Sequence, residues 1–122
     1  MDKIRITGGQ PLTGTIPISG AKNAALPLMI ASLLTDETLT LVNVPRLSDV
    51  TALSRILSNH GVDRSVAGKR IGQSAETGQT ISLTARQIVD TCAPYELVST
   101  MRASFWVIAP ILARMGEAKV SL

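Results

Sequence analysis

Cysteine and histidine are almost absent from this 122-residue sequence, and their scarcity excludes several kinds of site. Cys92 is the single cysteine, so no disulfide can form within the chain, which suits a reducing cytoplasm. A lone cysteine beside an apolar segment is more often a small buried hydrophobe than a nucleophile. His60 is the single histidine, which excludes a metal site built on two histidines, and we expect no metal.

Aromatic residues make up only 2% of the sequence, and Tyr95, Phe105 and Trp106 all fall in one short segment. The rest of the chain has nothing to stack bases, which argues against a single-strand nucleic-acid binding surface. The net charge is +3, with lysine and arginine scattered rather than clustered. This balance suits small anionic ligands at least as well as nucleic acid.

Apolar runs long enough to cross a membrane are also missing. Residues 24–34 and 103–113 are about half of the roughly 20 residues that a membrane span needs. The N-terminus lacks the apolar core of a signal peptide, so we expect a cytoplasmic protein. The composition, 45% hydrophobic and 17% charged, is that of one small folded domain.

Turn residues and hydrophobic periodicity divide the chain into alternating strands and helices. The patterns predict strands over residues 4–7, 14–19, 38–42, 62–67, 80–84 and 119–122, and helices over 23–34, 49–59 and 95–115. We expect Pro110 to kink the last helix and Gly116 to end it. Residues 68–79 are typical of a long hairpin loop, whereas 85–90 fit either a short helix or a connector. The alternation predicts the α/β (α+β) class, with helices packed on sheets.

Lys22 lies at the start of the first predicted helix, after the turn Ser19-Gly20-Ala21. A helix N-terminus has free N–H groups and a partial positive charge, so a lysine is electrostatically misplaced there. An anion held by the N–H groups and the ammonium together would relieve the misfit. Asn23 adds an amide that can donate and accept. The alternative is that Lys22 extends into solvent at small cost.

Arg102 is the second candidate, on the last predicted helix. Helical spacing places Val98, Phe105 and Trp106 on the same stripe, where a guanidinium is partly desolvated and favours an anion or an aromatic face. The alternative is an arginine that reaches solvent along the apolar surface. The acidic residues are dispersed, and Asp49 is most simply a favourable acid in the first turn of a helix.

Several motifs together resemble one family, the UDP-N-acetylglucosamine enolpyruvyl transferases. The resemblance covers nearly the whole chain and is weakest over residues 68–79. It is carried by the run Ile18-Ser19-Gly20-Ala21-Lys22-Asn23-Ala24-Ala25-Leu26-Pro27, by residues 43–45 and 47–50, by residues 93–98, and by Met101-Arg102-Ala103-Ser104 with Trp106.

The resemblance implies a fold of two similar domains, each an inverted α/β barrel built from βαβαββ units. The family's enzymes are much longer, so this chain would be their N-terminal portion and its barrel incomplete. Residues 1–21 would be strands of the second, C-terminal domain, and residues 22–122 the first part of the N-terminal domain. The missing C-terminal part of the same enzyme would then be the partner of residues 1–21.

The resemblance also implies an activity without a cofactor. The family transfers the enolpyruvyl group of phosphoenolpyruvate to the 3-hydroxyl of UDP-N-acetylglucosamine and releases phosphate, the first committed step of peptidoglycan synthesis. Lys22 and Asn23 would contact phosphoenolpyruvate. Arg102 would contact the UDP-sugar, with Ala103 and Trp106 lining its pocket.

The family's catalytic Cys or Asp belongs to a loop that would follow Leu122, and Cys92 is not that residue. We therefore expect these residues alone to be inactive. One alternative is the related enolpyruvyl transferase of the shikimate pathway, 3-phosphoshikimate 1-carboxyvinyltransferase, which has Lys-Ser where this chain has Lys22-Asn23. The other is a non-catalytic anion-binding domain.

Overall fold

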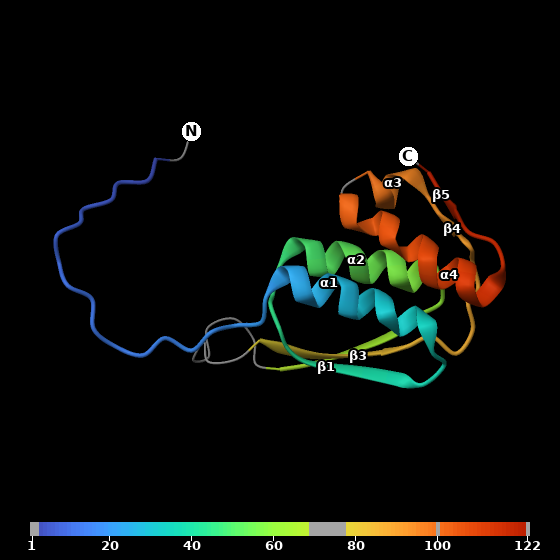
Figure 1. The fold of residues 1–122 in the computed structure, drawn as a ribbon, viewed down its shortest axis with the longest axis horizontal. Helices are drawn as coiled ribbons and strands as arrows, with labels where there is room; N and C mark the ends of the chain where they lie inside the picture. Colours follow the sequence, from blue (N-terminus) through green and yellow to red (C-terminus); the bar gives the residue numbers. More distant parts are fainter. Residues whose placement is uncertain (1–2, 69–77, 100, 122) are drawn as a thin grey trace.

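The computed structural model describes residues 3–68, 78–99 and 101–121. From residue 22 onward, helices pack against a small sheet (Figure 1). The elements in chain order are α1 (Lys22–Ala31), the 3-10 helix η1 (Ser32–Leu34), β1 (Thr38–Val44), α2 (Ser48–Asn59), β2 (Asp63–Ala67), β3 (Gln79–Thr84), β4 (Cys92–Ala93), α3 (Tyr95–Val98), the 3-10 helix η2 (Arg102–Val107), α4 (Ile108–Met115) and β5 (Lys119–Val120). This mixed architecture confirms the predicted α/β class.

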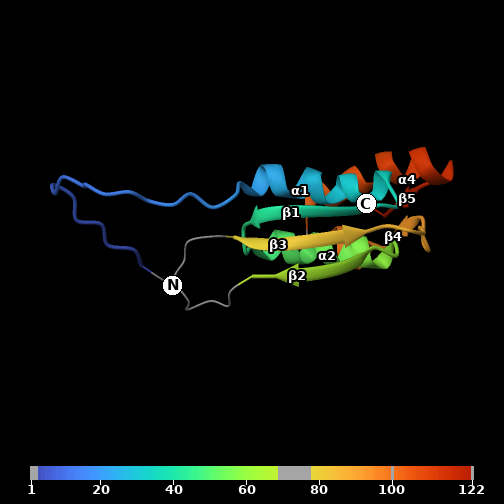
Figure 2. The same cartoon turned by 90° about the horizontal axis from the view of Figure 1, so that it is seen from below.

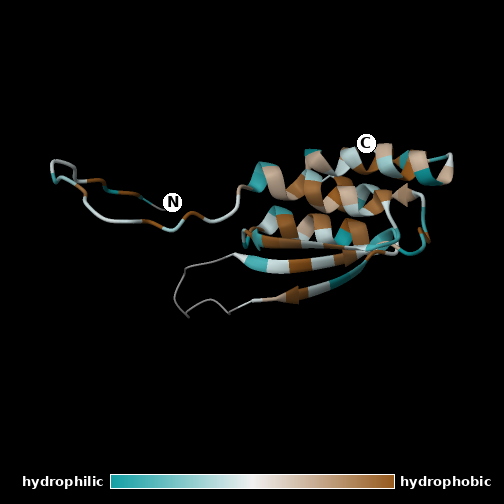
Figure 3. Ribbon diagram, turned by 60° about the horizontal axis from the view of Figure 1, so that its bottom comes forward, coloured by the Kyte–Doolittle hydropathy of each residue, from teal (hydrophilic) through white to brown (hydrophobic). Residues whose placement is uncertain are grey.

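The main sheet has three antiparallel strands in the order β1-β3-β2, which lie side by side in the view of Figure 2. Side chains alternate along the central strand β3, so Ile81 and Leu83 are fully buried. Figure 3 shows the same alternation of apolar and polar residues along the strands. Thr40 pairs with Ser82 across the strands, and their hydroxyls are hydrogen-bonded at 3.1 Å. The strands predicted over 38–42, 62–67 and 80–84 are confirmed.

Helices α1 and α2 lie side by side and provide a large part of the core (Figure 1). The apolar residues of α2 recur at helical spacing, which turns one stripe inward. That stripe is buried, together with three residues from α1 and η1, in the following set: Val50, Leu53, Ile56, Leu57, Met29, Ile30 and Leu33. The predicted helices 23–34 and 49–59 are therefore confirmed to within a residue or two.

The long helix predicted over residues 95–115 is wrong, because the segment is divided into α3, η2 and α4. Met101 is extended, with φ −155° and ψ 120°, and this breaks the helical path. The buried hydroxyl of Ser104 donates to the carbonyls of Val98 and Met101, which stabilises the break. Pro110 consequently lies in the first turn of α4, where its missing N–H costs nothing, instead of kinking a helix interior. Gly116 ends α4 as predicted, at φ 76°.

The strands predicted over residues 4–7 and 14–19 are also wrong for this chain, because residues 3–21 form neither helix nor strand. They run away from the folded part (Figure 1), and Ile4, Ile6, Ile16 and Ile18 are 84–88% exposed. A strand needs a neighbour to accept its ladder hydrogen bonds, and among the described residues no strand pairs with this segment in a ladder. The assignment of residues 1–21 to a second domain stays a prediction.

Three further predictions concern connecting segments. The predicted strand at 119–122 corresponds to β5, which pairs in parallel with β4. Residues 85–90 form no helix or strand, and most of the loop predicted over 68–79 lies outside the described residues. Across the described part of the chain, no helix is long and apolar enough to traverse a bilayer.

Candidate anion-binding site

One open pocket of about 370 Å³ gathers all five residues that the sequence singled out. It lies where the first turns of α1 and α2 meet the start of η2, so three segments distant in sequence contribute to it. Its lining residues are Lys22, Asn23, Leu26, Asp49, Met101, Arg102, Ala103 and Trp106. The structure therefore brings the predicted residues together, while their individual roles stay predictions.

Lys22 is the first residue of α1, directly after the extended Ala21. No side chain caps this helix, and its first backbone hydrogen bonds run from Ala24 and Ala25 to the Ala21 carbonyl. The N–H groups of Lys22 and Asn23 come before those bonds, so neither has an acceptor further back in the helix. Among the described residues neither N–H group has a hydrogen-bond acceptor, and both belong to residues that line the pocket.

Asp49 is the site residue that sequence reasoning missed. Its carboxylate forms an ion pair with the Lys22 ammonium. The two side chains are 49% and 30% exposed, and an ion pair so open to water contributes only about 0–1 kcal/mol. Lys22 therefore has a partner within the protein, and whether it also binds an external anion stays a prediction. Asp49 is part of the motif at residues 47–50 that carries the family resemblance. The sequence alone indicates only a favourable acid at a helix start, and so does not predict its contact with Lys22.

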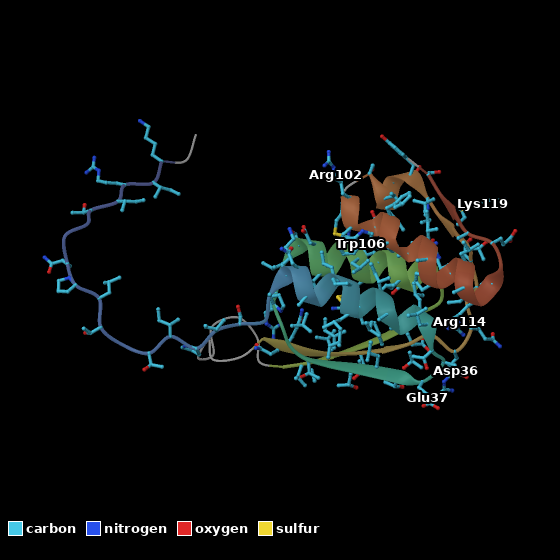
Figure 4. The ribbon with its side chains drawn as sticks, in the orientation of Figure 1. Asp36, Glu37, Arg102, Trp106, Arg114 and Lys119 are labelled. Carbon is cyan, nitrogen blue, oxygen red and sulfur yellow. The ribbon has the colours of Figure 1, made fainter. Side chains whose placement is uncertain are left out.

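Arg102 and Trp106 line the pocket from η2, and the Arg102 side chain projects outward from this helix (Figure 4). Both are exposed, Trp106 by 52%, so the guanidinium is less desolvated than the predicted helical stripe implied. The two residues also line a neighbouring cavity of about 440 Å³, together with Tyr95, Phe105 and others. Aromatic side chains beside an arginine suit a ligand that has both a ring and an anionic group.

The charges of the pocket favour anions. Lys22 and Arg102 contribute two positive charges against the single negative charge of Asp49. Within the described ranges, no cluster of three or more His, Cys, Asp or Glu side chains could hold a metal ion. Cys92 lines neither cavity, since it lies in β4, where Asn59 donates to its carbonyl at 3.0 Å.

Comparison with known proteins shows which fold and which protein family this chain resembles. The structure resembles the crystal structure of the enolpyruvyl transferase NikO from Streptomyces tendae, with a TM-score of 0.71 at 22% identity, over 91% of this chain and 24% of that chain. The molecule therefore has part of the enolpyruvyl transferase fold. Its sequence matches the EPSP synthase (3-phosphoshikimate 1-carboxyvinyltransferase) family over residues 6–122, and the chain belongs to that family.

Individual relatives are more similar in sequence than the solved structure is. The chain is 79% identical over 122 residues to the UDP-N-acetylglucosamine 1-carboxyvinyltransferase of Methylorubrum extorquens strain PA1. It is 77% and 74% identical to the enzymes of the same name from Methylobacterium radiotolerans and Chelativorans sp.. In each case it spans 28% of the relative's length. The predicted resemblance and the predicted fold, of which only part is present, are confirmed.

Proposed function

We propose that these residues form part of a UDP-N-acetylglucosamine 1-carboxyvinyltransferase of peptidoglycan synthesis. The reaction forms a C–O bond between the 3-hydroxyl of the sugar and the central carbon of phosphoenolpyruvate, breaks the bond from that carbon to the phosphate oxygen, and releases phosphate. The observation that carries the proposal is the single pocket that unites Lys22, Asn23, Arg102, Ala103 and Trp106. The 79% identity to an enzyme of that name supports it.

Phosphoenolpyruvate is assigned to the start of α1. Its phosphate and carboxylate are the groups that unpaired helix N–H donors and an ammonium bind well. Lys22 supplies the ammonium, and Asn23 adds a side-chain amide. Because the pair between Lys22 and Asp49 is weak and open to water, a substrate anion can share or replace the carboxylate.

The UDP-sugar is assigned to η2. Arg102 has a planar fork of donors that matches two diphosphate oxygens, and Trp106 offers an exposed ring face. Ala103 is small enough to leave room between them. The two cavities that Arg102 and Trp106 share provide space for a ligand of nucleotide-sugar size.

The remaining groups are assigned to other parts of the longer protein, since this chain spans 28% of its relatives. The exposed isoleucines of residues 3–21 support the assignment of that segment to a second domain, which would bury them. The active site would then lie between two domains of a cytoplasmic enzyme.

The test is Lys22→Ala in the full-length protein, with Lys119→Ala as the control because Lys119 does not line the pocket. We expect Lys22→Ala to lower phosphate release by about 100-fold, the usual effect of removing one charge-stabilising donor. The circular dichroism spectrum should be unchanged, and Lys119→Ala should be active. Wild-type turnover in Lys22→Ala would refute the assigned role.

The family's description names a second acceptor, 3-phosphoshikimate. If the full-length protein used 3-phosphoshikimate in preference to the UDP-sugar, the acceptor substrate proposed here would be wrong. A full-length protein that binds phosphoenolpyruvate but releases no phosphate with either acceptor would favour the non-catalytic alternative.

A further inference from the structure

Asn43 has the left-handed backbone conformation, with φ 57°, near the end of β1. Among the described residues it is the one non-glycine residue with positive φ. Asparagine tolerates this conformation better than most residues, but such outliers persist only where surrounding contacts hold them. The register of β1 against β3 shifts between Leu41 and Val44, so the outlier lies at an irregularity of the sheet.

Asn43 joins three segments of the chain. Its backbone carbonyl accepts a hydrogen bond from the Gly20 N–H at 3.1 Å. Its side-chain oxygen accepts one from the Gly78 N–H at 3.0 Å, and its side-chain nitrogen donates weakly to the Ile18 carbonyl at 3.4 Å. The end of β1 is thus tied to the segment that enters α1 and to the start of β3.

Two glycines make this junction possible. A Cβ atom on Gly20 would lie 2.1 Å from the Asn43 carbonyl oxygen, and one on Gly78 would lie 2.5 Å from the Val44 oxygen. Backbone approaches this close admit no side chain. The three residues therefore form one packed unit, which we call the Asn43 junction: Gly20, Asn43 and Gly78.

We propose that Asn43 is a positioning residue for the anion site and acts through Gly20 on Lys22 and Asn23. Gly20 is two residues before Lys22, and α1 has no side-chain cap to fix its first turn. The Gly20 N–H is bonded directly to Asn43, so the Asn43 junction fixes the turn that leads into α1 and with it the N–H groups of Lys22 and Asn23. The ammonium of Lys22 is held in addition by its ion pair with Asp49. The role assigned to phosphoenolpyruvate here rests on the proposed function.

Three variants of the full-length protein separate positioning from general destabilisation. Asn43→Ala removes both side-chain bonds and disfavours the left-handed backbone. Asn43→Asp keeps the acceptor for Gly78 and the tolerance of positive φ, so it should restore near-wild-type behaviour. Asn59→Ala is the matched control, because it removes one side-chain hydrogen bond, to Cys92, outside the pocket. Asn43→Gly replaces Asn43→Ala if the latter fails to fold.

The first readout is steady-state kinetics. We expect Asn43→Ala to raise the KM for phosphoenolpyruvate about tenfold, because small displacements of a binding group weaken it strongly. The KM for the UDP-sugar should change no more than in Asn59→Ala, whereas the melting temperature should fall in Asn43→Ala because the left-handed backbone is disfavoured. An unchanged KM for phosphoenolpyruvate in Asn43→Ala, or equal effects on both substrates, would overturn the proposal.

The second readout does not depend on catalysis. Amide hydrogen exchange at Gly20, Ala24 and Ala25 should be faster in Asn43→Ala and unchanged in Asn59→Ala. Unchanged exchange in Asn43→Ala would overturn the proposal even if activity fell. If the wild-type protein does not use phosphoenolpyruvate, the proposed function fails, and the exchange rates still decide whether Asn43 holds the start of α1.

Discussion

Arg114 links the end of α4 to two other segments, the end of η1 and the residues that follow β3. Its guanidinium donates hydrogen bonds to the carbonyls of Leu33 at 3.1 Å, Thr35 at 3.3 Å, Ala85 at 2.7 Å and Arg86 at 3.4 Å. The arginine lies near the end of α4 (Figure 4). The carbonyls of Leu33 and Thr35 lie at the end of η1, and those of Ala85 and Arg86 lie directly after β3. We predict that replacing Arg114 loosens all three segments at once.

The expected cost follows from the two shorter bonds, to Leu33 and Ala85. A hydrogen bond to a charged donor is worth about 1.5–3 kcal/mol, and the two longer ones should add little. Arg114→Met keeps the apolar stem of the side chain, so it isolates the polar contribution. We expect the free energy of unfolding to fall by about 3 kcal/mol, out of the roughly 5–15 kcal/mol typical of a domain. Arg114→Lys should recover only part of the loss, because an ammonium lacks the planar fork.

The assay is urea denaturation of the 122-residue chain, followed by far-UV circular dichroism and by the fluorescence of Trp106, its single tryptophan. Arg55→Met is the matched control, since Arg55 is exposed on α2. A loss in Arg114→Met within about 0.5 kcal/mol of the control, the usual range for surface substitutions, would refute the reasoning.

Three further changes test other parts of the molecule. Asp49→Asn removes the carboxylate that competes for Lys22, so the dissociation constant of inorganic phosphate, measured by calorimetry, should fall; a rise would show that Asp49 positions Lys22 instead. Gly116→Ala should cost about 1 kcal/mol in thermal unfolding, because its Cβ meets no atom and only the left-handed backbone resists, and Gly116→Asn should cost less. Ile81→Ala should lower the free energy of unfolding in urea by about 2–5 kcal/mol, whereas Ser82→Ala on the opposite face of β3 should stay below about 1 kcal/mol.

The parts of the fold that could be predicted from the sequence are those in which local pattern and tertiary packing agree. The stripe of α2 has helical spacing, and the core accepts that stripe without change. Strand β3 alternates polar and apolar residues, and its two faces are in fact differently buried. In such segments the burial of the apolar face stabilises the structure that local preference already favours.

The wrong predictions concern segments in which the local sequence pattern and the tertiary packing disagree. Residues 95–115 have helical composition throughout, but the buried Ser104 hydroxyl bonds to carbonyls on both sides of a break that composition does not reveal. Residues 4–7 and 14–19 alternate as strands do, but alternation specifies only which face would be buried. Pairing needs a second strand in register, and among the described residues no strand forms a ladder with this segment.

The candidate site shows both outcomes at once. The position of Lys22 at a helix start indicated that an anion would bind over the turn, and that binding stays a prediction. It did not reveal that α2 places Asp49 beside the start of α1, because only the packing of the two helices creates the contact. The pocket therefore contains a carboxylate as well as two cationic side chains. Arg102 leaves it with net positive charge, so an incoming anion gains from the pocket as a whole while it competes with Asp49 for Lys22 alone. That competition makes anion affinity depend on how Lys22 is held, which is why the contacts of Gly20 and Asn43 matter to binding.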